Sequence, residues 1–141
     1  MLAIDEAVEA QHQLEQQLRS AFGTNNSDFR ALLIVFRLRR RGLTAHPSDL
    51  TRALGISSGT ASQIIARLSD AGLLERTTDP TDARSGIITL TDDAERRLRI
   101  STTELRTDLD RIIGSLDPDE ERRIVDLLEQ VKTAFATHTH R

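Results

Sequence analysis

Residues 48–57 read SDLTRALGIS and residues 61–76 read ASQIIARLSDAGLLER, and these two stretches decide the fold. Four aliphatic residues have the spacing of the buried side chains of two helices that cross around a tight turn: Leu50, Leu54, Ile56 and Ile64. Gly55 supplies the left-handed backbone that such a turn requires. The sequence therefore predicts a helix-turn-helix, whose second helix runs over about 58–71.

Two short strands are predicted directly after the second helix. Residues 73–78, LLERTT, and residues 87–91, IITLT, are rich in aliphatic and β-branched side chains. The DPTD sequence at 79–82 is typical of a turn. The segment 73–91 therefore reads as a β-hairpin with a long tip, and the hairpin completes a winged helix-turn-helix.

Amphipathic helices flank this core. Apolar residues recur at helical spacing before Gly23, over about 28–41, from 92 to about 115, and after Asp117. Helix-capping residues are expected at Ser27 or Asn26, His46, Ser57, Thr91 and Asp117. The predicted fold class is mainly α with a small β-hairpin wing.

Composition narrows the classes of protein. The chain has 141 residues, of which 38% are hydrophobic and 29% charged, as in a folded domain. No apolar run approaches the roughly 20 residues of a membrane span, and the acidic N-terminus does not resemble a signal peptide. The cysteine count is 0, which excludes disulfides and thiol chemistry. We expect a protein of the cytoplasm with no membrane association.

The charge distribution is uneven along the chain. Residues 28–86 carry nine Arg and six acidic residues, whereas the segments before and after them are both net acidic, and the total charge is −3. A basic middle indicates contact with a polyanion, although a merely solvated arginine-rich surface fits equally well. The run Arg39–Arg41 suits the C-terminal end of a helix and is expected there rather than on DNA.

Enzymatic and metal chemistry are not expected. The sequence shows no nucleophile–base pairing and no Gly-rich phosphate loop. The histidines lie apart from one another, and His138 and His140 are expected in a solvated tail rather than in a zinc site. We therefore predict neither a catalytic residue, nor a cofactor, nor a bound metal.

Beyond the two stretches quoted first, residues 79–85, DPTDARS, and 88–91, ITLT, give the chain a specific resemblance. From about residue 28 to 116 it resembles the MarR family of bacterial transcriptional regulators. The resemblance implies a winged helix-turn-helix over 28–91 that binds double-stranded DNA. It also implies a homodimer, in which the helices of residues 1–27 and 92–141 intertwine, reading a pseudo-palindromic operator, most often as a repressor.

The predicted DNA-binding residues lie on the second helix and on the hairpin. They are Ser58, Thr60, Ser62, Gln63, Arg67, Arg76, Asp82, Arg84 and Ser85. Gln63 can read adenine through paired hydrogen bonds, and the small residues Gly59 and Ala66 allow the helix a close approach.

Several of these residues have alternatives. Gln63 can be simply solvated, Arg67 can contact phosphate or pair with Asp70, and Arg76 can serve the DNA backbone or the neighbourhood of Glu75. The resemblance implies that Asp82 orients Arg84 toward the minor groove.

The resemblance also implies a small anionic or aromatic effector, with Arg30 or Arg37 as candidate partners for its charge. The absence of cysteine excludes the redox-sensing members of the family. A different function remains open, because the net acidic charge also fits a winged-helix protein-interaction module that does not bind DNA.

Overall fold

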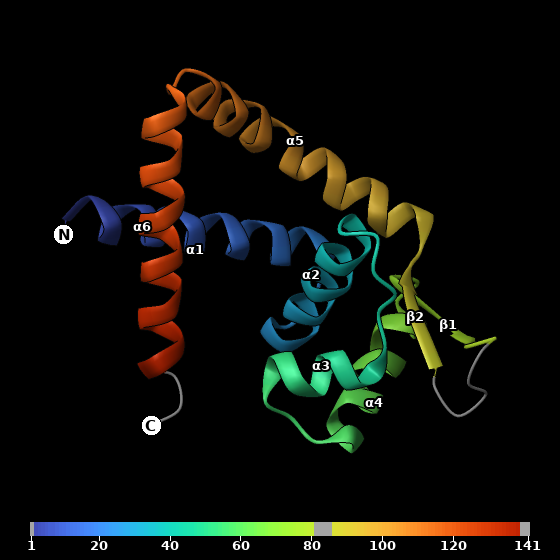
Figure 1. Ribbon diagram of the computed structural model, residues 1–141. Helices are drawn as coiled ribbons and strands as arrows, with labels where there is room; N and C mark the ends of the chain where they lie inside the picture. The colour runs from blue at the N-terminus through green and yellow to red at the C-terminus, as the bar shows by residue number, and fades with distance from the viewer. Residues whose placement is uncertain (1, 81–85, 139–141) are drawn as a thin grey trace. The chain divides into compact units, whose positions relative to one another are not determined.

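The computed structural model describes residues 2–80 and 86–138. The elements are α1 Leu2–Phe22, α2 Asn26–Arg40, α3 Pro47–Leu54, α4 Ser58–Asp70, β1 Leu74–Thr78, β2 Gly86–Leu90, α5 Asp92–Gly114 and α6 Pro118–His138 (Figure 1). The chain divides into two compact units, residues 1–101 and 102–141, and the boundary along the chain falls within α5. The predicted fold class, mainly α with a β-hairpin wing, is confirmed.

Short polar side chains set the starts of the helices. The Ser57 hydroxyl accepts a hydrogen bond from the Thr60 backbone N–H at 3.1 Å, which confirms Ser57 as the cap of α4. For α2 the prediction was wrong. The cap is Asn25, whose side-chain oxygen lies 2.8 Å from the backbone nitrogen of Asp28, so the helix begins at Asn26 and not at about 28.

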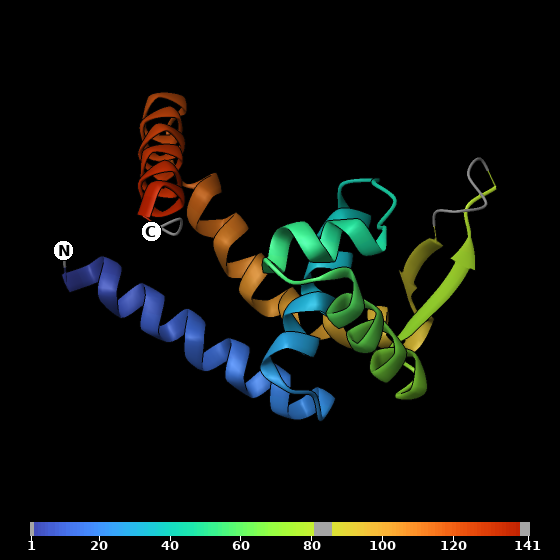
Figure 2. The ribbon, with the colours of Figure 1, turned by 90° about the horizontal axis from the view of Figure 1, so that it is seen from below.

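The core of the first unit is formed by all of its elements except the first turns of α1. The largest fully buried side chains come from α2, α3, α4, both strands and α5: Phe29, Leu32, Val35, Leu50, Ile64, Leu68, Leu74, Ile88 and Leu98. Figure 2 shows α3 and α4 side by side, with the hairpin extending away from the helices. The described strands of the hairpin are therefore anchored at their base, where Leu74 and Leu90 are buried.

The two strands pair antiparallel, from Leu74 opposite Leu90 to Thr78 opposite Gly86. The backbone N–H of Ile88 also donates to the carbonyl oxygen of Ala45 at 2.9 Å, so the loop before α3 adds one bridge to β2. This bridge holds the base of the wing against the helix-turn-helix.

The second unit contains the end of α5 and all of α6. Asp117 accepts hydrogen bonds from the backbone N–H groups of Asp119 (2.8 Å) and Glu120 (2.9 Å), and its own N–H donates to the Glu120 carboxylate at 3.0 Å. The predicted capping box is thus confirmed. None of the described helices is long and apolar enough to cross a lipid bilayer.

Candidate nucleic-acid interface

The turn between α3 and α4 presents α4 at the surface of the first unit. Gly55 has φ +65°, in the left-handed region, and the next residue, Ile56, donates its N–H to the carbonyl oxygen of Thr51 at 3.2 Å. The positive φ of the turn is the conformation predicted for Gly55 from the sequence. Only residues 55–57 separate α3 from α4, and the two helices pack against each other while one side of α4 stays exposed.

One face of α4 is buried and the opposite face is exposed. The buried residues are the aliphatic stripe predicted from the sequence: Ala61, Ile64, Ile65 and Leu68. The exposed face carries small or polar residues: Ser58, Gly59, Thr60, Ser62, Gln63 and Ala66. Arg67 and Asp70 are also exposed, nearer the C-terminal end of α4. The small and polar residues from Ser58 to Ala66 fit a helix that enters the major groove of DNA.

The first turn of α4 contains a pair of hydroxyl groups. The oxygens of Ser57 and Thr60 lie 2.9 Å apart, so one hydroxyl donates to the other. The backbone N–H groups of this turn and the helix dipole favour an anionic group at this end. The first turn of α4 therefore has the electrostatic character that a phosphate contact requires.

Arg67 forms an ion pair that the sequence did not indicate. Its Nε and Nη2 donate to the two carboxylate oxygens of Asp28 at 3.1 and 2.7 Å, so the partner is Asp28 on α2 and not Asp70 on α4. The hydrogen bond to Asp28 raises the pKa of Arg67 above its already high ordinary value, with desolvation opposing the shift. A phosphate contact by Arg67 stays a prediction.

Asp28 is the residue of this region that sequence reasoning missed. Its side chain is buried, with 8% exposure, although an aspartate in the first turn of a helix is usually a solvated partner of the helix dipole. Asp28 and Arg67 are 39 residues apart, and no local pattern joins them. Only the packing of α2 against α4 brings the two charges together.

On the wing, Arg76 of β1 lies across the start of β2. A Cβ atom placed on Gly86 would lie 3.0 Å from the Arg76 Nε, so the absence of a side chain at Gly86 makes room for the guanidinium. Arg76 is exposed. The three predicted tip residues, Asp82, Arg84 and Ser85, lie outside the described residues.

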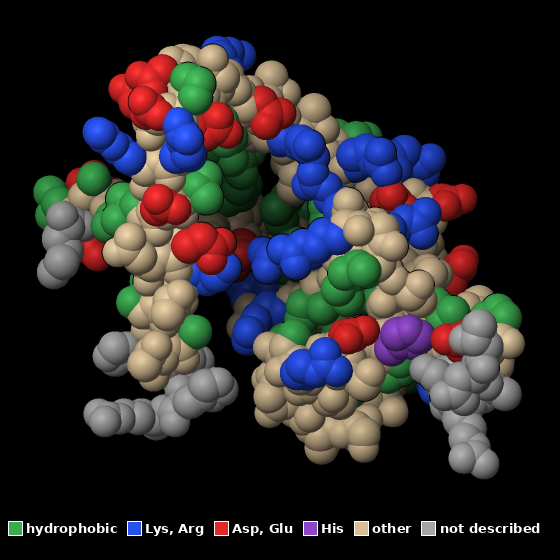
Figure 3. Space-filling view, viewed as in Figure 1, with side chains coloured by type: hydrophobic (Ala, Val, Ile, Leu, Met, Phe, Trp, Pro, Cys, Tyr) green, Lys and Arg blue, Asp and Glu red, His purple; other side chains and the backbone are tan. Residues whose placement is uncertain are grey.

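The arginines at the end of α2 are engaged within the first unit. Nε of Arg39 lies 2.7 Å from Glu95, whose other oxygen binds Arg99 at 2.6 Å. The guanidinium of Arg40 lies 5.8 Å from the ring centroid of Phe36. Figure 3 shows basic side chains gathered over α2 and the first half of α5. These contacts agree with the expected role of Arg39 and Arg40 at a helix end.

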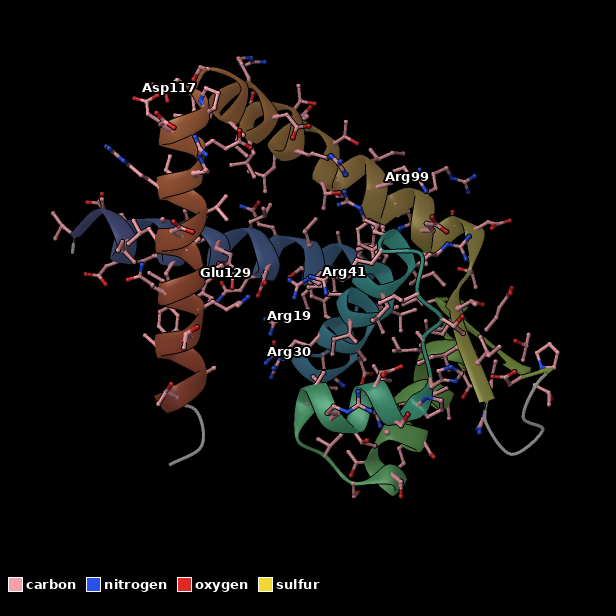
Figure 4. All side chains as sticks on the ribbon, viewed as in Figure 1. Arg19, Arg30, Arg41, Arg99, Asp117 and Glu129 are labelled. Carbon is pink, nitrogen blue, oxygen red and sulfur yellow. The ribbon has the colours of Figure 1, made fainter. Side chains whose placement is uncertain are left out.

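Two cavities of the first unit include Arg30. One, of about 400 Å³, lies between α1 and α2 and is lined by His12, Glu15, Gln16, Arg19, Asn26, Phe29 and Arg30. The other, of about 340 Å³, is lined by residues of α2, α3 and α4 and of their connections, and its apolar lining residues are Leu54, Ile56 and Ile64. Figure 4 shows Arg19 and Arg30 extending to the same side of the molecule. Arg37, the other candidate for an effector contact, lines neither cavity.

Metal ligands do not cluster in the part of the chain that the structure describes: no group of three or more His, Asp or Glu side chains there could hold an ion.

Together, the glycine turn, the exposed face of α4 and the β-hairpin define a winged helix-turn-helix protein. A family model described as "MarR family" matches residues 22–85, which contain α2, α3, α4 and β1. Among curated proteins, the uncharacterized HTH-type transcriptional regulator YdgJ of Bacillus subtilis (strain 168) is 25% identical over 85 residues. These findings show that residues 22–85 are similar to the MarR family of transcriptional regulators, and the predicted resemblance is confirmed.

The match to YdgJ covers 60% of this chain and 52% of that protein, so the chain spans about half the length of the curated relative. Solved structures share the fold. A MepR mutant from a multidrug resistant S. aureus clinical isolate has a TM-score of 0.71 at 16% identity, covering 95% of both chains. A second S. aureus MepR mutant, bound to an oligodeoxyribonucleotide, has a TM-score of 0.60 at 19% identity, covering 95% of this chain and 96% of that one.

Proposed function

We propose that this protein is a transcriptional regulator that binds double-stranded DNA, with α4 as the recognition helix in the major groove. The observation that carries the proposal is the exposed face of α4, which presents small and hydrogen-bonding side chains on a helix whose other face is fully buried. The regulator names of the relatives support this function rather than an enzymatic one. Such a protein acts where the chromosome lies, so the cytoplasm is its proposed location.

Within this interface the residues have different roles. Gln63 reads a base edge, while Ser58, Thr60 and Ser62 contact phosphates or bases near the N-terminal end of α4. On the wing, Arg76 contacts the DNA backbone. At the tip, Asp82 orients Arg84 toward the minor groove, and Ser85 lies beside them; these three assignments rest on the sequence resemblance alone.

The protein acts as a homodimer. Large apolar side chains are exposed on α1, on the second half of α5 and on α6: Leu2, Ile4, Val8, Leu105, Leu109, Ile112, Ile113, Ile124, Val125, Leu127, Leu128 and Phe135. Exposed apolar surface of this extent is typical of a protein–protein interface. Residues 1–27 and 92–141 supply this interface, and residues 28–91 bind DNA. Two recognition helices then lie about 34 Å apart and read a pseudo-palindrome.

Regulation follows from the geometry of such a dimer. The protein represses transcription by occupying its operator, and a small anionic or aromatic effector releases it. The cavity between α1 and α2 supports this step, because Arg19 and Arg30 line it together and offer two cations to an acidic ligand. A ligand that binds one spacing of the recognition helices better than the other shifts the population toward that spacing.

The test is a gel-shift titration of the protein against DNA from its own upstream region, over a series of salt concentrations. Each phosphate contact contributes about −0.9 to the slope of log K against log salt, so several contacts give a steep negative slope. A flat response, together with tight binding to another protein, would favour the protein-interaction module to which the net charge of −3 points.

A further inference from the structure

The carboxylate of Asp28 links α2 to the recognition helix. Within residues 2–80 and 86–138, Asp28 is the only charged side chain that is buried, and both of its oxygens accept hydrogen bonds from Arg67. The backbone N–H of Asp28 is held in turn by the side chain of Asn25. The carboxylate is therefore fixed to the first turn of α2, and the Arg67 guanidinium is fixed to the carboxylate.

This contact differs in kind from the rest of the packing of α4. The buried stripe of α4 is aliphatic, and aliphatic contacts are non-directional, so they permit small rotations of a helix about its axis. A bidentate pair between a guanidinium and a carboxylate has a defined plane and direction. The Asp28–Arg67 pair is therefore a directional contact of α4, the helix that also carries Gln63 one turn before Arg67.

The pair also determines where a cation points. Arg67 is half exposed, with 50% of its side-chain area accessible, yet two of its nitrogens face Asp28. A buried carboxylate without its partner is costly, so Arg67 is held in this position. Nε and Nη2 of Arg67 are thereby less available for contacts with phosphates than those of an unpaired arginine on α4.

We propose that Asp28 is a positioning residue that determines sequence specificity. It fixes the rotation of α4, so that Gln63 meets a defined base edge, and it restrains Arg67 from sequence-independent contact with phosphate. The inference rests on the proposed DNA binding and adds to it a source of discrimination that lies outside the surface facing the DNA.

The experiment measures the affinity of the full-length protein for its selected operator and for random DNA, over a range of salt concentrations. Asp28→Asn keeps the shape of the side chain and releases Arg67. We expect the ratio of specific to non-specific affinity to fall about tenfold, as for one lost base contact. We also expect the salt slope on random DNA to steepen by up to about 0.9, the value of one added phosphate contact.

The matched control is Asp93→Asn. Asp93 is exposed, forms a surface ion pair with Arg96 at 2.9 Å, and its substitution changes the net charge by the same amount. We expect this variant to keep the wild-type ratio of specific to non-specific affinity. A change seen only in Asp28→Asn would then be caused by the altered position of α4 and not by the altered net charge.

The double variant Asp28→Asn/Arg67→Gln keeps the inference falsifiable if the single variant does not fold. It places two carboxamides together and removes the cation, so we expect lower specificity with no steepening of the slope. The inference is overturned if Asp28→Asn matches Asp93→Asn, or if the folded double variant keeps the wild-type specificity ratio. A flat salt response of the wild-type protein instead overturns the proposed function, and this inference with it.

Discussion

The guanidinium of Arg97 lies 4.1 Å from the ring centroid of Phe22, and its Nη2 donates to the carbonyl oxygen of Ala21 at 2.7 Å. Arg97 is in the second turn of α5, whereas Ala21 and Phe22 end α1. One side chain therefore satisfies a backbone carbonyl at the end of α1 and covers an aromatic ring that also contacts Phe29, at 6.0 Å between centroids.

Arg97→Ala is expected to lower the free energy of unfolding by about 1–2 kcal/mol, because it removes a cation–π contact and a charge-assisted hydrogen bond together. Urea denaturation followed by circular dichroism, at a fixed protein concentration, measures the loss. Arg96→Ala is the control, since Arg96 forms a surface ion pair with Asp93 and is 64% exposed. That control should change stability by less than about 0.5 kcal/mol. Equal losses for the two variants would contradict the assignment.

Gly55 and Gly114 provide a matched test of backbone strain. A Cβ would meet nothing within 4 Å at either position, but Gly55 has φ +65° and Gly114 is the last residue of α5. Gly55→Ala should destabilise the protein by about 1 kcal/mol, because alanine is strained in the left-handed region. Gly114→Ala should instead stabilise the protein by about 0.5 kcal/mol, because alanine lowers the conformational entropy of the unfolded chain. Thermal unfolding of the two variants should shift in opposite directions.

Gln63→Ala should relax the preference for one base pair of the operator. The expected loss is about 1–3 kcal/mol on the preferred sequence and little on the others, because a paired hydrogen bond to a base edge is removed. Binding to a panel of operator variants with single base changes measures the effect. Gln17→Ala, at an exposed glutamine of α1, serves as the control. Small, equal losses on every sequence would remove the base-reading role of Gln63.

Leu128→Glu should shift the protein from dimer to monomer. Leu128 is 61% exposed on α6, and a buried carboxylate in an apolar interface is unfavourable. Sedimentation velocity at several concentrations measures the association. Thr133→Glu places the same charge on the polar side of α6, where the Thr133 hydroxyl donates to the carbonyl oxygen of Glu129, and should leave the dimer intact. A Leu128→Glu variant with wild-type sedimentation would exclude α6 from the interface.

Local signals in the sequence predicted most of the fold. The glycine at residue 55, the capping box at Asp117 and the apolar stripe of α4 are each contained within a few residues, and the structure has all three. The cap of α2 was misplaced because Asn25, Asn26 and Ser27 can all cap a helix, and the sequence alone does not choose among them.

The two long-range ion pairs were not predictable in the same way. Arg67 pairs with Asp28, and Arg39 with Glu95, across long separations along the chain. Such partners are chosen by the packing of one helix on another, which a one-dimensional pattern does not encode. The proposed DNA contacts remain predictions, including those of Asp82, Arg84 and Ser85 at the tip of the wing.

The boundary between the two compact units, at residue 101, falls inside α5 and not in a loop. A chain cut at that point would leave orphan carbonyl groups on one fragment and orphan amide groups on the other. The winged segment consequently does not end between two secondary-structure elements on its C-terminal side. Transferring it to another protein therefore requires either the whole of α5 or a newly designed helix end.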